Sequence, residues 1–189
     1  MKTQLTEARA GVITDAMRQV AASEGVDVQT VRDEVAAGRL VIAANRAHLK
    51  TNLKAVGIGR VLATKVNANI GTSSIRCSVP AEIEKMNAAL EVGADAMMDL
   101  STGGDLDSIR AELLAHCPVP FGTVPIYQVI EGRDVEDVTP ELILKTVEKQ
   151  AKQGVDFFTI HAGLLREHLP LLENRVMGIV SRGGALLAK

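Results

Sequence analysis

The sequence predicts an α/β fold in which strands and helices alternate as part of a (β/α)8 barrel, preceded by a small helical module. Short apolar runs alternate with amphipathic segments throughout residues 59–189. The runs are apolar at consecutive positions, which is typical of parallel strands covered by helices on both faces. Glycine and capping residues lie at the boundaries, where helices are expected to begin and end.

Residues 1–58 form the expected N-terminal module. Apolar residues recur at helical spacing over residues 3–24 and are followed by Gly25, which predicts one amphipathic helix. A second helix is expected from the N-cap Asp27 to Gly38. The apolar run LVIAAN then predicts a short strand, and the charged segment AHLKTNLK completes the module.

Residues 59–189 form the expected barrel domain. Strands are predicted in VLATKVNANI, ADAMMDL, PVPFGTVPI, VDFFTI and RVMGIV, and helices in AEIEKMNAALEVG, DLDSIRAELLAH, TPELILKTVEKQAKQG and LLREHLPLLEN. Thr139 before Pro140 is typical of a helix start, and Gly93 and Gly154 mark helix ends. A closed (β/α)8 TIM-type barrel takes about 250 residues, so about five βα units predict an incomplete barrel. Because its open sheet edge favours aggregation, we expect a fragment of a longer protein or a piece that needs a partner.

The composition limits the partners that the chain can bind. The formal net charge is −2, and lysines and arginines are scattered among acidic residues, which argues against nucleic acid or a membrane as a partner. No stretch approaches the roughly 20 apolar residues that cross a bilayer, so a cytoplasmic protein is expected. Cys77 and Cys117 lie far apart without CxxC spacing, which indicates thiols rather than a disulfide or zinc site. Cys117 is expected to pack at the entry of a strand, and the role of Cys77 is open.

Polar side chains follow each predicted strand at its C-terminal end. They are Asn67 and Asn69, then Asp99, Ser101 and Thr102, then Tyr127 and Gln128, then His161, and finally Ser181 and Arg182. Strand-to-helix loops are commonly polar, which explains any one of these segments but explains five in series poorly. Because the carboxyl ends of parallel strands meet at one edge of a sheet, we predict a ligand site there.

The residue types suggest roles at this site. The SRGG turn offers hydroxyl, guanidinium and backbone N–H groups that suit a phosphate or another anion. Asn69 can donate to and accept from a heteroaromatic ring or a sugar, and Met98 can be core packing or an apolar wall. His161 can be a packed core residue, a hydrogen-bond partner, a general acid or base, or a metal ligand. The metal role is the weakest, because no second ligand lies at metal spacing. The other histidines are expected on loop or helix surfaces: His48, His116 and His168.

Five segments resemble the ThiC family, the phosphomethylpyrimidine synthases of thiamine biosynthesis. They are KVNANIGTSS, GADAMMDLSTGG, PVPFGTVPIYQ, QAKQGVDFFTIHAG and GIVSRGGALLAK, in the order and with nearly the spacing of the family. The resemblance covers residues 55–189, and the preceding module resembles the lead-in of compact members. The motifs GxGxxG, GxxxxGK[ST], HExxH and GxSxG are absent.

The resemblance implies a (β/α)8 lyase that converts aminoimidazole ribotide into hydroxymethylpyrimidine phosphate by radical S-adenosylmethionine chemistry. It also implies a [4Fe–4S] cluster, a divalent metal (zinc), and a homodimer at full length. The matching substrate-binding positions are Asn69, Met98, Tyr127, His161, Ser181, Arg182 and Gly183. The anion at the SRGG turn would be the ribotide phosphate.

The sequence also departs from the family. Members continue beyond SRGG with a DGLRPG loop, a glutamate, two metal-binding histidines and a CxxCxxxxC motif for the cluster, none of which occurs in this sequence. Two distant cysteines cannot hold the cluster. We therefore expect the chain to carry the substrate-binding half and to be inactive alone. Two alternatives remain: the paralogous 5-hydroxybenzimidazole synthase of cobamide synthesis, and a protein that binds ribotide without catalysis.

Overall fold

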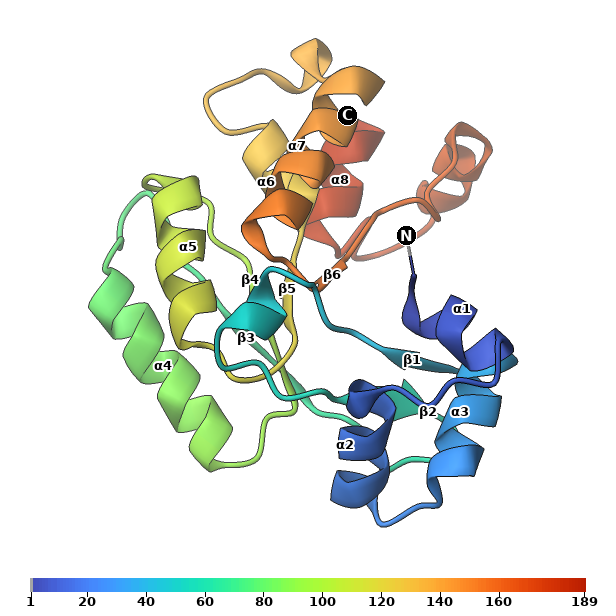
Figure 1. Ribbon diagram of the computed structural model, residues 1–189. Helices are drawn as coiled ribbons and strands as arrows, with labels where there is room; N and C mark the ends of the chain where they lie inside the picture. Colours follow the sequence, from blue (N-terminus) through green and yellow to red (C-terminus); the bar gives the residue numbers. More distant parts are fainter. Residues whose placement is uncertain (1) are drawn as a thin grey trace.

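The computed structural model describes residues 2–189 as a mixed α/β fold built around a parallel sheet (Figure 1). The sheet has the order β3–β4–β5–β6, and its strands are Asn67–Ile70, Ala96–Asp99, Phe121–Thr123 and Phe157–Phe158. The register pairs Asn69 with Met98, and Gly122 with Phe157. The predicted α/β class and the parallel arrangement of these strands are confirmed.

Helices connect the parallel strands. They are α4 (Val79–Glu91), α5 (Leu106–His116), the short α6 (Pro125–Val129) and α7 (Pro140–Gln153), with the 3-10 turn η2 (Val135–Asp137) before α7. The Thr139 side chain accepts from the backbone N–H of Leu142, which confirms the predicted cap before Pro140. The main apolar core lies between the sheet and these helices and includes Ile70, Met86, Met97, Ile109, Leu113 and Phe121.

The described residues up to Gly59 form three α-helices and a two-stranded antiparallel sheet. The helices are α1 (Gln4–Arg9), α2 (Asp15–Glu24) and α3 (Val28–Ala36). The prediction of one helix over residues 3–24 is wrong, because Gly11 has a φ of 76° and the Thr14 side chain caps a new helix. The apolar spacing continues across the break since α1 and α2 pack into one core. The predicted strand is confirmed as β1 (Leu40–Ile42), which pairs antiparallel with β2 (Gly57–Gly59).

The end of the chain differs most from the sequence prediction. The strand expected in RVMGIV does not form: residues 175–180 are turn and coil, and Val176 and Met177 are exposed. Gly178 has a φ of 56°, which interrupts extended backbone, and the two-residue β6 offers a short edge for pairing. The helix expected in LLREHLPLLEN is the 3-10 helix η3 (Arg166–Leu172), because Pro170 inside it has no N–H to donate. Helix α8 (Arg182–Ala188) follows.

The strand predicted in PVPFGTVPI ends earlier than expected. It stops at Thr123, because Pro125 lacks the N–H that a sheet ladder needs and instead starts helix α6. Tyr127 and Gln128 are therefore helical rather than strand-end residues.

A buried ion pair joins the N-terminal residues to the parallel sheet. His48, in the 3-10 turn η1 (His48–Lys50), was expected on a surface but is buried. Its Nδ1 lies 2.6 Å from Asp156 Oδ2, and its Nε2 donates to the carbonyl oxygen of Cys117 at 2.8 Å. The Asp156 carboxylate also accepts from the backbone N–H groups of Asn45 and Phe121. The surface prediction failed because the partner lies far along the chain, just before β6.

No helix within residues 2–189 combines the length and the apolar character needed to cross a membrane.

Candidate functional site

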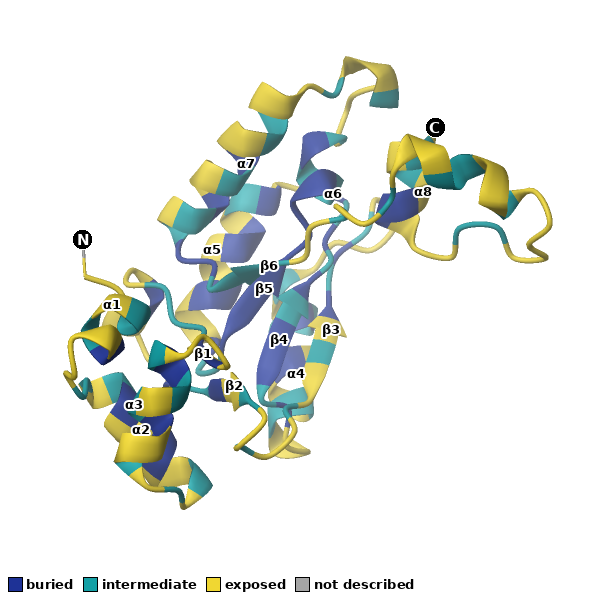
Figure 2. Ribbon diagram, turned by 90° about the vertical axis from the view of Figure 1, so that its right-hand side faces the viewer, coloured by how far each residue is buried: buried dark blue, intermediate teal, exposed yellow. Residues whose placement is uncertain are grey.

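The predicted site residues lie at the carboxyl ends of the parallel strands or in segments that follow them. Helices α6 and α8 lie beyond this end of the sheet, and the N-terminal helices lie toward the other end (Figure 2). Helix α6 directly follows β5 and carries Tyr127, while Asn69 and Met98 are neighbours in the register of β3 and β4. Parallel topology thus brings together side chains that are distant in the sequence.

His161 contacts the start of helix α8. Its Nε2 lies 2.8 Å from the hydroxyl oxygen of Ser181, which also caps α8 by accepting from the backbone N–H of Gly184. The ring packs directly against Gly183, where a Cβ atom would lie 2.2 Å from His161 Cε1. The other ring nitrogen, Nδ1, is buried and has no hydrogen-bond partner within residues 2–189. Either tautomer leaves Nδ1 with an unmet hydrogen bond, which a ligand could supply.

Arg182 lies over the ring of Tyr127. Its Cζ is 5.3 Å from the ring centroid, a distance typical of a cation–π contact. The ring belongs to an apolar cluster with Val124 and Val129, against which Met98 also packs. Arg182 is exposed, so its guanidinium can bind an anion while it stays over the aromatic ring.

Met98 and Asn69 lie beside each other on β4 and β3. The Thr159 hydroxyl donates to Met98 Sδ at 3.7 Å, which links β4 to the segment before His161. Asn69 is exposed, and its Oδ1 accepts from Asn67 Nδ2 at 2.9 Å. Within residues 2–189, the amide nitrogen of Asn69 and the second acceptor position of its Oδ1 therefore remain available to a ligand.

The polar residues that follow β4 bond to the neighbouring loop rather than pointing toward a ligand site. Burial raises the pKa of Asp99, although hydrogen bonds from Ser101 oppose this. Asp99 Oδ1 accepts from the backbone N–H of Ser101, and Ser101 Oγ accepts from that of Thr72. Thr102 donates its backbone N–H to Thr72. These bonds join the loops after β3 and β4 and use polar groups that the sequence suggested for a ligand.

Two hollows described by the structure lie elsewhere. One, of about 730 Å³, is bordered by α1, β1 and α7, and another, of about 330 Å³, lies between α6 and α7. None of the seven predicted residues lines either of them. Asn69, Ser181 and Arg182 are exposed, so a ligand bound to them would stay partly exposed.

The sequence profile of the radical SAM ThiC family matches residues 3–189. The chain belongs to the radical SAM ThiC family. It is 55% identical over 190 residues to the phosphomethylpyrimidine synthase of Natronomonas pharaonis, covering all of this chain and 39% of the relative. It is 54% identical to that of Halobacterium salinarum strain R1, covering all of this chain and 40% of the relative. The chain therefore spans about 40% of the length of the curated relatives it matches.

The described residues of this ThiC-family chain do not fit an iron–sulfur cluster or a zinc ion. Within residues 2–189, no three His, Cys, Asp or Glu side chains gather as a metal site. Cys117 is buried, its thiol donates to the carbonyl oxygen of Val119 at 3.2 Å, and burial raises its pKa to about 12. Cys77 is exposed in the loop after β3, where its Sγ lies close to Gly104.

Sequence reasoning missed a buried polar network behind the site. Arg110 on α5 is 2% exposed and lies beside Asp107. A signal was present, because Arg110 occupies the apolar stripe of α5 between Leu106 and Leu113. A charged residue in such a stripe indicates a buried pairing partner.

Proposed function

We propose that this chain binds aminoimidazole ribotide as the substrate-binding part of a phosphomethylpyrimidine synthase of thiamine biosynthesis. Family membership supports the reaction, since the relatives named above carry that activity in their names. The parallel sheet supports the further proposal that β3 to β6 are part of a (β/α)8 barrel. The main observation that supports the site is the position of His161, which contacts Ser181 and Gly183. Its Nδ1 is buried without a hydrogen-bond partner within residues 2–189 and is available to a ligand.

The contacts suggest how a ribotide would lie. Arg182 and Ser181 suit the phosphate, because a guanidinium and a hydroxyl can both donate to its oxygens. Tyr127 and Met98 would pack against the flat imidazole ring, and Asn69 would donate to a polar edge of the ligand. His161 Nδ1 would complete its missing hydrogen bond on the same molecule.

In the radical SAM family, S-adenosylmethionine and an iron–sulfur cluster supply the radical chemistry. The described residues offer ligands for neither a cluster nor a zinc ion, so we propose that this chain contributes binding and positioning and is inactive alone. The same observation favours a second candidate, a protein that binds ribotide without turnover.

Isothermal titration calorimetry of the chain with aminoimidazole ribotide tests the proposal. Arg182→Ala should lower affinity by about 1.5 to 3 kcal/mol if the arginine makes a charge-assisted bond to phosphate. His161→Ala should also weaken binding. Arg18→Ala, which removes an exposed arginine from α2, is the matched control and should bind like wild type. Absence of binding by the wild-type chain, or unchanged affinity in both site variants, would refute the proposal.

A further inference from the structure

Helix α6 carries Tyr127 but is too short to be stable by itself. It spans five residues, and within residues 2–189 no side chain caps its first turn. Short helices in water are marginal, so tertiary contacts must fix its rotation. Ile126 and Val129 supply apolar contacts, since both are buried. Apolar contacts alone leave room for small rotations, whereas hydrogen bonds specify a direction.

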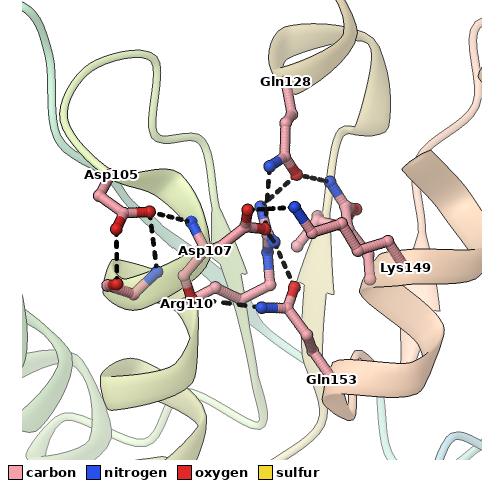
Figure 3. A network of polar contacts seen from close by, with 9 residues as sticks. Asp105, Asp107, Arg110, Gln128, Lys149 and Gln153 are labelled. Carbon is pink, nitrogen blue, oxygen red and sulfur yellow. Dashed lines mark hydrogen bonds and ion pairs between the residues drawn. The ribbon is translucent and has the colours of Figure 1, made fainter. Parts of the chain in front are cut away.

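Gln128 is the polar anchor of α6. Its Oε1 accepts from Arg110 Nη2 at 2.9 Å and from Gln150 Nε2 at 2.8 Å. Its Nε2 donates to Asp107 Oδ1 at 3.0 Å. One side chain thus bonds to both α5 and α7 and uses both acceptor positions of its carbonyl oxygen (Figure 3).

The partners of Gln128 are themselves fixed. The buried guanidinium of Arg110 also donates to Gln153 Oε1 at 2.6 Å and to Asp107 at 3.3 Å. Lys149 forms an ion pair with Asp107 from the α7 side. The Arg110 side chain is buried, and a buried charge that loses its partners is strongly destabilising. Gln128 is therefore held by a network that cannot easily rearrange.

Consecutive residues of a helix point in directions about 100° apart. Gln128 contacts α5 and α7, whereas Tyr127 lies under Arg182 at the predicted site. Fixing Gln128 therefore fixes the rotation of α6 and with it the direction of the Tyr127 ring. We propose that Gln128 is a positioning residue for Tyr127, held in place by Arg110 and Gln150. Its link to ligand binding rests on the proposed function, but its effect on Tyr127 does not.

The chain contains a natural probe for this proposal. Tyr127 is its single tyrosine and there is no tryptophan, so intrinsic fluorescence reports on this ring alone. In Gln128→Leu, quenching of Tyr127 by acrylamide should rise toward that of free N-acetyltyrosinamide, and the fluorescence anisotropy should fall. Ribotide affinity should fall about tenfold, since misplacement of a contact group weakens its interaction.

Gln153→Leu is the matched control. Gln153 accepts from Arg110 and donates to the carbonyl of Asp107, so its loss removes bonds from the same network but none that reach α6. Its quenching should match wild type even if its stability falls. Equal quenching in Gln128→Leu and Gln153→Leu would overturn the proposal.

A second variant covers the case in which Gln128→Leu does not fold. Gln128→Glu keeps acceptor oxygens for Arg110 and Gln150 but places a like charge beside Asp107, so its quenching should be intermediate. Wild-type quenching in a folded Gln128→Glu, when Gln128→Leu is unfolded, would also overturn the proposal. If the quenching pattern appears but no variant binds ribotide, the positioning role stands and the proposed function fails.

Discussion

Replacement of Asp156 by asparagine is expected to lower the free energy of unfolding by about 3 to 5 kcal/mol, the cost of breaking a buried ion pair. Both side chains of the His48–Asp156 pair have 0% exposure, and the nitrogen and oxygen lie 2.6 Å apart. The carboxylate serves three donors, counting the backbone N–H groups of Asn45 and Phe121. Asparagine offers a single acceptor oxygen, so at least one buried donor would lose its partner.

The same pair should make stability depend on pH. Burial disfavours the charged imidazole, but the hydrogen bond and charge of Asp156 outweigh it, so the pKa of His48 is raised. A raised pKa in the folded state contributes stability that is fully present below the unfolded pKa of about 6.5. That contribution is lost as pH rises through the folded pKa. The thiol of Cys117 also faces Asp156, but with a pKa of about 12 it stays protonated over this range.

Urea unfolding followed by circular dichroism, from about pH 6 to about pH 9, measures both effects. The free energy of unfolding should fall toward alkaline pH in wild type, and this part of the slope should be missing in His48→Gln. Glu148→Gln is the control, because its ion pair with Lys152 is exposed and should contribute little to stability. An unchanged pH slope in His48→Gln, or a cost for Asp156→Asn no larger than that of the control, would refute the reasoning.

Two further predictions concern the site and the thiols. Gly183→Ala should weaken ribotide binding about tenfold, because a Cβ would collide with the His161 ring; Gly163→Ala, where nothing lies within 4 Å of the added atom, should bind normally in the same calorimetry. Equal affinities would contradict the packing described for His161. A thiol reagent such as Ellman's should modify the exposed Cys77 in the native chain and the buried Cys117 only after denaturation. Rapid modification of two thiols in the native chain would contradict the burial of Cys117.

Local patterns in the sequence predicted most of the helices and their ends. The spacing and caps of α7, from Thr139 to Gly154, needed no long-range information, because a helix start depends on the first residues of the helix itself. The break at Gly11 was missed because α1 and α2 bury the same stripe of apolar residues. RVMGIV has the composition of a strand, but a strand also requires a neighbour with free backbone groups.

For the candidate site too, the sequence predicts one part and not another. Its location at the ends of the strands follows from parallel topology, so Asn69, Tyr127 and His161 could be grouped from their sequence positions. The contacts between side chains could not be predicted. The position of Arg182 over the Tyr127 ring depends on how α8 packs, and the burial of His48 depends on a carboxylate 108 residues away.

Strand β6 is so short that the two ends of the sheet are close together along the chain at this strand. Asp156 stands just before β6 and His161 just after it, and β6 itself has two residues. At about 3.3 Å per residue, the segment from Asp156 to His161 is a short connection between the two ends of the sheet. Loss of the proton on His48 at alkaline pH weakens the ion pair at one end of this segment, so the position of His161 at the other end should become less fixed and ligand affinity should fall.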